Sequence, residues 1–203
     1  MKKLESTLLN MALVLTSVSL VAGALLGYMN QLTAEPIRIV EANTLSSGIK
    51  KVILGGAEGE LTLTKVDTVL NDKGKVDFVI YSTADASGKP LGTAVQRSEN
   101  GFGGPLTVLT GFDDKGTILG YEVLKHSETP GLGAKAGEWF RNKGNIIGRN
   151  PSTPLKVSKD NGDVDAITAS TITSRAFLKA VNASYNHLFV ERNANSGATT
   201  TKE

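Results

Sequence analysis

The segment LLNMALVLTSVSLVAGALLGYM, residues 8–29, divides the chain into an apolar N-terminal part and a more polar remainder. It lies inside a longer stretch, from Ser6 to Ala34, that contains no charged residue. As a helix with a rise of about 1.5 Å per residue it would be roughly 33 Å long, enough to cross the hydrocarbon layer of a bilayer, which is about 30 Å thick. We therefore predict a single transmembrane helix over residues 8–29.

A cleaved signal peptide is the alternative interpretation, because Ala22-Gly23-Ala24 has the small-x-small form of a cleavage site. The apolar region of a signal peptide is usually about 7–15 residues long. Here the apolar run continues past that site through Leu25 and Leu26. The length of the run therefore favours an uncleaved anchor.

The charges that flank the apolar run predict its orientation. Lys2 and Lys3 precede the run, whereas the first basic residue after it is Arg38. Positive residues beside a span are retained preferentially on the cytoplasmic side. We therefore expect residues 1–7 to be cytoplasmic, in a single-pass protein of the cell inner membrane whose main domain is periplasmic.

The composition narrows the possible chemistry. The 203 residues include 22 Lys and Arg against 20 Asp and Glu, which gives a net charge of only +2. A nucleic-acid-binding domain normally carries a strongly basic surface, so no nucleic-acid partner is expected. The chain has no cysteine and only two histidines, which excludes disulfides, thiolate-bound metals and iron–sulfur clusters, and no metal site is predicted. Any redox chemistry would need an organic cofactor.

The part of the chain after the apolar run divides into three regions. Residues 30–60 are predicted to be a connector with a possible helix over 34–51, and residues 61–192 a folded domain. Residues 193–203 are polar and rich in small side chains, and we expect a disordered tail there.

The folded region changes its pattern midway. Short runs of alternating apolar and polar residues fill positions 61–124, and turn sequences such as Asn71-Asp72-Lys73-Gly74 separate them, as in antiparallel strands. Helical periodicity follows, weakly over residues 134–142 and strongly over 171–190. The predicted fold class is α+β, with an antiparallel sheet packed against helices.

Hydroxyl side chains crowd the start of the last predicted helix, where residues 165–175 read DAITASTITSR. Hydroxyls can cap the backbone N–H groups in the first turn of a helix. A helix N-terminus is also a common binding site for phosphate. The residues alone leave both interpretations open, a helix cap with extra hydroxyls or an anion site.

Two glycine-containing loops also suggest a ligand site. Residues 126–133, HSETPGLG, follow a predicted strand, and the tight turn Phe102-Gly103-Gly104-Pro105 precedes another. Pro-Gly turns let the backbone approach a flat ligand closely, although a plain solvated turn has the same pattern.

Residues 125–133, KHSETPGLG, followed by the segment that begins at Asp165, resemble the FMN-binding G subunit of the Rnf-type electron transport complex. The related C subunit of the sodium-pumping NADH:quinone reductase is similar. The resemblance covers nearly the whole chain, including its membrane helix. It implies an electron-carrier subunit, rather than a stand-alone enzyme, in a membrane complex that couples electron transfer between ferredoxin and NAD to ion translocation.

In that family, FMN is attached through its phosphate to the last residue of an Asp-x-x-Ser-Gly-Ala-Thr motif. The matching position is Thr171, six residues after Asp165. Thr168, Ala169 and Ser170 stand where the family has Ser, Gly and Ala. Because a Thr hydroxyl is a poor nucleophile without a base, attachment implies a flavin transferase that uses FAD and Mg²⁺.

The resemblance implies polar contacts of the flavin ring with Glu128 and Thr129. Arg175 could pair with the phosphate or lie on a solvated helix face, and Trp139 is expected in the core rather than on the flavin. No catalytic residue is predicted, because a carrier needs no general acid or base. The predicted cofactor-binding residues are Thr171, Thr168, Ser170, Thr173, Ser174, Glu128, Thr129, Gly131 and Leu132.

A second segment, Ser196-Gly197-Ala198-Thr199, matches the four-residue motif literally. Asn193 replaces its Asp, however, and no apolar helix follows. Structural context therefore favours Thr171 over Thr199.

Two other functions compete with an FMN carrier. The alternative is a membrane-anchored extracytoplasmic binding or scaffold domain without a cofactor, in which the hydroxyl-rich segment is only a helix cap. A stand-alone flavin reductase is disfavoured, because no Gly-x-Gly-x-x-Gly motif follows a predicted strand.

Overall fold

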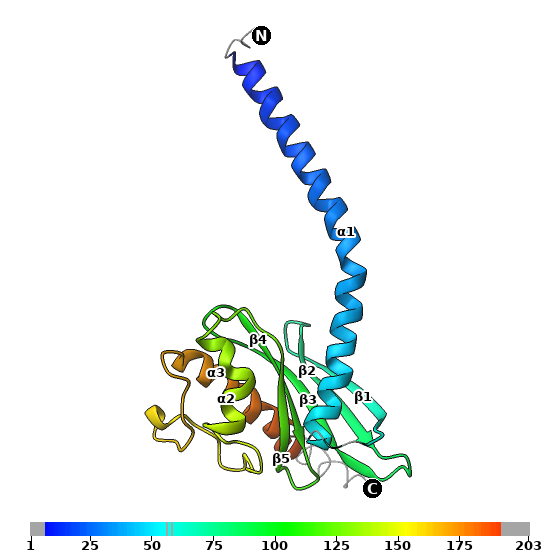
Figure 1. Ribbon diagram of the computed structural model, residues 1–203, viewed down its shortest axis with the longest axis vertical. Coiled ribbons are helices and arrows are strands. Elements are labelled where there is room, and N and C mark those ends of the chain that lie inside the picture. The colour runs from blue at the N-terminus through cyan, green and yellow to red at the C-terminus, as the bar shows by residue number, and fades with distance from the viewer. Residues whose placement is uncertain (1–6, 56, 58, 192–203) are drawn as a thin grey trace, which may run out of the picture. The chain divides into compact units, whose positions relative to one another are not determined.

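The computed structural model describes residues 7–55, 57 and 59–191 (Figure 1). The predicted tail at 193–203, which contains Thr199, lies outside this part, as do residues 1–6. Contacts within the chain divide it into two compact units, Met1–Thr44 and Leu45–Glu203. The first unit contains most of the long helix α1, Leu8–Leu54, and the second contains the sheet and the remaining helices.

The N-terminal part of α1 is apolar on all sides and its large side chains are exposed. A helix of this kind needs lipid or another protein around it. Its length and composition are sufficient to cross a membrane, in agreement with the helix predicted over residues 8–29. The helix also continues without a break through residues 34–51, where the sequence indicated a possible helix.

The second unit is built on one antiparallel sheet in which each strand pairs with the next along the chain. Its turns follow the sequence prediction: the Asn71 side chain accepts hydrogen bonds from the backbone of Lys73 and Lys75 at 3.0 Å each. The predicted antiparallel sheet is therefore confirmed. Its strands are β1 Thr62–Leu70, β2 Val76–Ala84, β3 Pro90–Asn100, β4 Pro105–Phe112 and β5 Ile118–Lys125.

The last turns of α1, from residue 45 onward, pack on one face of this sheet. Ile49, Val52 and Ile53 are buried there against apolar residues of the strands. Gly111 of β4 and Gly120 of β5 are paired, and a Cβ at either position would lie 2.6 or 2.9 Å from the carbonyl oxygen of Val52. The two glycines let the backbone of the helix approach the sheet directly.

The other face of the sheet carries α2, Ala136–Asn142, and α3, Thr171–Tyr185 (Figure 1). Aromatic rings fill the layer between them: Phe140 of α2 stacks on Phe177 of α3 at 4.2 Å between centroids, and Tyr121 of β5 meets Phe177 edge-on at 4.9 Å. All three are fully buried. This core fixes the N-terminus of α3 relative to the loop that follows β5, and the predicted α+β class is confirmed.

Three short helical turns complete the unit. They are η1 Gly133–Lys135, η2 Ser158–Asp160 and η3 Asn186–Glu191. The helix predicted over 134–142 is thus the pair η1 and α2, and the helix predicted over 171–190 is α3 followed by the wider π-helical turn of η3.

Candidate functional site

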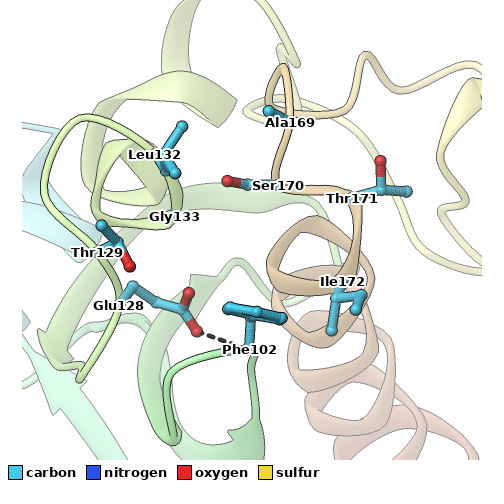
Figure 2. Close-up of a pocket in the computed structure, with 9 residues that line it drawn as sticks. All are labelled: Phe102, Glu128, Thr129, Leu132, Gly133, Ala169, Ser170, Thr171 and Ile172. Carbon is cyan, nitrogen blue, oxygen red and sulfur yellow. Dashed lines mark hydrogen bonds between the residues drawn. The ribbon is translucent and has the colours of Figure 1, made fainter.

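A cavity of about 430 Å³ lies where the three stretches singled out in the sequence meet (Figure 2). The turn before β4, the loop after β5 and the N-terminus of α3 each supply part of its wall. The cavity is in the size range of pockets for small organic ligands, about 300–1,000 Å³. Its lining residues are Phe102, Glu128, Thr129, Leu132, Gly133, Ala169, Ser170, Thr171 and Ile172.

The loop after β5 forms its wall through a tight turn. Gly131 has a φ of 78°, which suits glycine, and the N–H groups of Leu132 and Ala134 both donate to the carbonyl of Thr129. The turn places Thr129 and Leu132 at the cavity. Gly131 itself lines a different hollow, beside α2.

Glu128 lines the cavity and is buried, and both of its oxygens accept hydrogen bonds from the protein. Oε1 accepts the backbone N–H groups of Phe102 and Gly103 at 2.8 and 3.2 Å, and Oε2 accepts the hydroxyl of Thr173 at 2.8 Å. Hydrogen bonds to a charged acceptor are stronger than neutral ones. The carboxylate therefore joins all three walls, a role that the sequence did not predict for it.

The N-terminus of α3 forms the opposite wall. Ala169, which lines the cavity just before the helix, has a φ of 60°, a left-handed conformation that favours glycine. This conformation gives a physical reason for the family motif to have Gly at the matching position. Ser170 is the N-cap residue, yet its side chain makes no capping hydrogen bond, and its hydroxyl points into the cavity (Figure 2). The backbone N–H groups of the first turn are thus left without a side-chain cap.

Two other predicted hydroxyl residues lie behind this wall. Thr173 and Ser174 are fully buried; Ser174 accepts a hydrogen bond from the N–H of Ile167 and donates one to the carbonyl of Ser170. Thr168 is exposed and does not line the cavity. The structure therefore brings Ser170 and Thr171 to the cavity and assigns Thr173 and Ser174 to its support.

Thr171 has a neighbour that the sequence did not indicate. The ammonium group of Lys159, in η2, donates a hydrogen bond of 3.2 Å to the Thr171 hydroxyl oxygen. The two residues are 12 positions apart, and no motif or periodicity connects them. The fold alone reveals this contact.

The sequence left two roles open for Arg175, pairing with the phosphate or lying on a solvated helix face. In the structure, Arg175 is paired with Asp160. Its guanidinium group makes two hydrogen bonds to Asp160, at 2.7 and 2.6 Å. These hydrogen bonds lower the pKa of the Asp160 carboxyl below its ordinary value and raise the pKa of Arg175. Arg175 lines a separate hollow beside η2 rather than the cavity.

Trp139 does not line the cavity. Its indole N–H donates a 2.8 Å hydrogen bond to the carbonyl of Asp165, and its ring packs against the core. Trp139 is half-buried and packs against the core from outside, so the core position expected from the sequence is met only in part, and the flavin-stacking alternative finds no support because Trp139 does not line the cavity.

Comparison with known proteins identifies the class of this domain. Residues 101–186 match the family model described as the FMN-binding domain. Every residue that lines the cavity lies inside this match. The domain is an FMN-binding domain carried on a helix that is long and apolar enough to cross a membrane.

Full-length relatives narrow the class to one family. The G subunit of the ion-translocating oxidoreductase complex from Methanosarcina acetivorans is 32% identical over 84% of this chain and 89% of its own length. The proteins of the same name from Shewanella oneidensis and Vibrio vulnificus are 30% and 34% identical, over 88% and 74% of this chain and the same shares of their own lengths. The chain belongs to the family of G subunits of the ion-translocating oxidoreductase complex, as its sequence motifs indicated.

Among solved structures, the C subunit of the Na⁺-translocating NADH-quinone reductase from Parabacteroides distasonis is similar. It has a TM-score of 0.42 and 21% identity, and the match covers 72% of this chain and 82% of that chain.

The residues of the cavity fit an FMN molecule. Phe102, Leu132 and Ile172 line the cavity with exposed apolar side chains, which a flat ring could pack against. The first turn of α3, without a side-chain cap, has N–H groups and the positive end of the helix dipole that could bind a phosphate. Gly133 lets the loop after β5 pack closely on Glu128 and Thr173, because a Cβ there would overlap the Glu128 carboxylate and lie 2.8 Å from the Thr173 hydroxyl.

Proposed function

We propose that this chain carries FMN in the cavity between residues 102, 128–133 and 169–172, as an electron-transfer subunit of an ion-translocating oxidoreductase complex. The observation that carries the proposal is the convergence of these three segments beside a helix N-terminus that has no side-chain cap. Bound FMN would supply the electron chemistry. The protein would hold its ring between apolar side chains and its phosphate at the start of α3. The complex would couple electron transfer between ferredoxin and NAD to ion translocation.

The FMN would be attached covalently at Thr171, the first residue of α3. The Thr171 oxygen would form a bond to the phosphorus of the FMN half of FAD, the pyrophosphate bond would break, and AMP would leave. A flavin transferase would supply Mg²⁺ and the base that takes the hydroxyl proton. The family motif and the place of Thr171 among the residues that line the cavity support this site.

In the membrane, α1 would anchor the subunit with residues 1–7 in the cytoplasm and the flavin domain in the periplasm. Lys2 and Lys3 before the apolar run support this orientation. The chain has no cysteine, so a single cysteine in the exposed β2–β3 turn, Ser87→Cys, can be labelled selectively. We expect a membrane-impermeant maleimide to label it in intact spheroplasts; labelling only after lysis would contradict the orientation.

Flavin fluorescence of the denatured protein tests the attachment. Wild type, Thr171→Val and Thr199→Val would each be co-expressed with an active flavin transferase and separated on a denaturing gel. We expect the fluorescence to disappear only in Thr171→Val. Its loss only in Thr199→Val would assign attachment to the C-terminal segment. A wild type without fluorescence, beside a labelled control protein, would contradict the covalent flavin.

If the wild type carries no covalent flavin, titration of the wild-type domain with free FMN distinguishes a non-covalent FMN carrier from a scaffold domain without a cofactor. Quenching of flavin fluorescence on titration would leave a non-covalent FMN carrier. The absence of both covalent and free binding would favour the anchored scaffold instead.

A further inference from the structure

We propose that Lys159 is a positioning residue for flavin attachment, which orients the Thr171 hydroxyl before the transfer and pairs with the phosphate afterwards. This inference rests on the proposed function. It starts from the 3.2 Å hydrogen bond between the Lys159 ammonium group and the Thr171 oxygen.

The turn that carries Lys159 is held in place by its own hydrogen bonds. The N–H groups of Asp160 and Gly162 both donate to the carbonyl of Val157, and Asn161 between them has a φ of 58°. A parallel bridge between Val157 and Val164 ties the base of the turn to the segment that leads to α3. The backbone at Lys159 therefore has a defined position, although its side chain is exposed.

Two consecutive residues of this turn bind two residues one helical turn apart on α3. Lys159 contacts Thr171, and Asp160 holds Arg175 through two hydrogen bonds. Positions i and i+4 lie on the same face of a helix, so the η2 turn lies along the first turn of α3. The Asp160–Arg175 pair docks the turn, and the docked turn brings Lys159 to the hydroxyl.

Lys159 and Arg175, the cationic side chains that η2 brings together with the first turn of α3, have different partners. The charge of Arg175 is balanced by Asp160, which accepts from two of its nitrogens. Within the described part of the chain, no carboxylate lies at ion-pair distance from Lys159, and its ammonium group bonds the Thr171 hydroxyl instead. Lys159 is therefore the cation that is available to a phosphate on Thr171.

The geometry has a consequence before the transfer. An ammonium group donates and cannot accept, so Lys159 occupies one lone pair of the Thr171 oxygen and leaves the hydroxyl hydrogen for a base of the transferase. The second lone pair can then attack phosphorus. By restricting the side-chain rotamer, the contact lowers the entropy that must be lost when the reacting atoms meet.

After the transfer, the Lys159 ammonium group would lie beside a negatively charged phosphate. The Thr171 oxygen becomes an ester oxygen of a phosphodiester with one negative charge, and the Lys159 ammonium group remains beside it. A charge-assisted hydrogen bond of this kind is about twice as strong as a neutral one. Because the side chain is exposed, salt should weaken it.

The rate of flavin attachment tests the first part of this inference. Full-length wild type, Lys159→Met and Lys159→Arg would be incubated with transferase, FAD and Mg²⁺, and covalent flavin followed with time. Lys156→Met is the matched control, because Lys156 is an exposed lysine of the same loop and the hydrogen bond to the Thr171 hydroxyl comes from Lys159. We expect Lys159→Met to lower the initial rate by roughly ten-fold, because it removes one hydrogen bond from a charged donor. Lys159→Arg should retain most of the rate, and Lys156→Met all of it.

The ³¹P NMR signal of the attached phosphate tests the second part and separates positioning from folding. We expect its chemical shift to change in flavinylated Lys159→Met and to remain unchanged in Lys156→Met, with equal melting temperatures for the unmodified proteins. Equal attachment rates in Lys159→Met and wild type, or equal losses in the Lys159 and Lys156 variants, would overturn the inference while leaving the flavin site intact. A wild type that takes no flavin at Thr171 would overturn both.

Discussion

The hydroxyl of Thr173 donates a 2.8 Å hydrogen bond to Oε2 of the buried Glu128 and so joins α3 to the loop after β5, across 45 positions of sequence. Oε1 of the same carboxylate accepts the N–H groups of Phe102 and Gly103 from a third segment. One side chain thus holds together the three walls of the proposed flavin cavity. A carboxylate suits this position because all its neighbours in these contacts are donors.

Substitution of Glu128 should separate its hydrogen bonds from its charge. In Glu128→Gln, the amide oxygen can still accept the two N–H groups, and the Thr173 hydroxyl can turn to accept from the amide nitrogen. We expect a loss of about 1 kcal/mol in unfolding free energy. Glu128→Leu leaves two N–H groups and a hydroxyl without a partner and should cost about 2–4 kcal/mol. Urea unfolding measures both; equal losses would mean that packing, rather than hydrogen bonding, governs this position.

Gly133 should not tolerate a side chain. A Cβ there would overlap Oε2 of Glu128 and lie 2.8 Å from the Thr173 hydroxyl, so Gly133→Ala should cost about 1–3 kcal/mol and weaken FMN binding. Gly137→Ala is the control, because a Cβ at that position of α2 meets nothing within 4 Å. It should be neutral or stabilise the protein by up to about 1 kcal/mol. Thermal unfolding and FMN titration compare the two variants. If Gly133→Ala has the stability and FMN affinity of the wild type, the loop after β5 can move to accommodate the added methyl group.

Ala169→Gly should stabilise the protein. Ala169 has a φ of 60°, a conformation that costs a residue with a Cβ about 1–2 kcal/mol. The greater freedom of glycine in the unfolded chain offsets part of this gain, and we expect a net increase of about 0.5–1 kcal/mol. The same exchange inside α3, Ala183→Gly, should instead destabilise the protein by about 1 kcal/mol. Destabilisation by Ala169→Gly in urea would contradict this explanation.

Tyr121 should make the stability fall at high pH. Burial raises the pKa of its hydroxyl from 10.0 to about 12, and the hydroxyl donates to the carbonyl of Ala136 at 3.1 Å. The pKa of Tyr121 is higher in the folded state than in the unfolded chain. The contribution of Tyr121 to the free energy of unfolding is therefore complete below about pH 10 and is lost between about pH 10 and 12. A shift of this size corresponds to about 2–3 kcal/mol.

Urea unfolding between about pH 9 and 12 measures this contribution. Tyr121→Phe keeps the ring that packs on Phe177 and removes only the titrating group. We expect the decline with pH to be shallower in the variant. Parallel curves for the two proteins would mean that other groups cause the decline.

The sequence predicted the elements of this protein well, because their signals are local. The apolar residues of 8–29 indicate a membrane helix through length alone, and alternating residues with turn signals indicate an antiparallel sheet. The loop at 126–133 and the segment at 165–171 were recognised as a pair from their order and spacing. The assignment of Thr171 as the attachment site stays a prediction; Thr171 lines the same cavity as Glu128, Thr129, Leu132 and Ser170.

The tertiary structure alone decided what these residues touch. Nothing in the sequence indicated that Glu128 bonds the protein on both oxygens, that Arg175 is paired with Asp160, or that Lys159 reaches Thr171. The physical reason is the range of the interactions. Helix and strand signals arise from neighbours a few positions apart, whereas these contacts join segments whose distance depends on how α3 packs on the sheet and how η2 docks on α3.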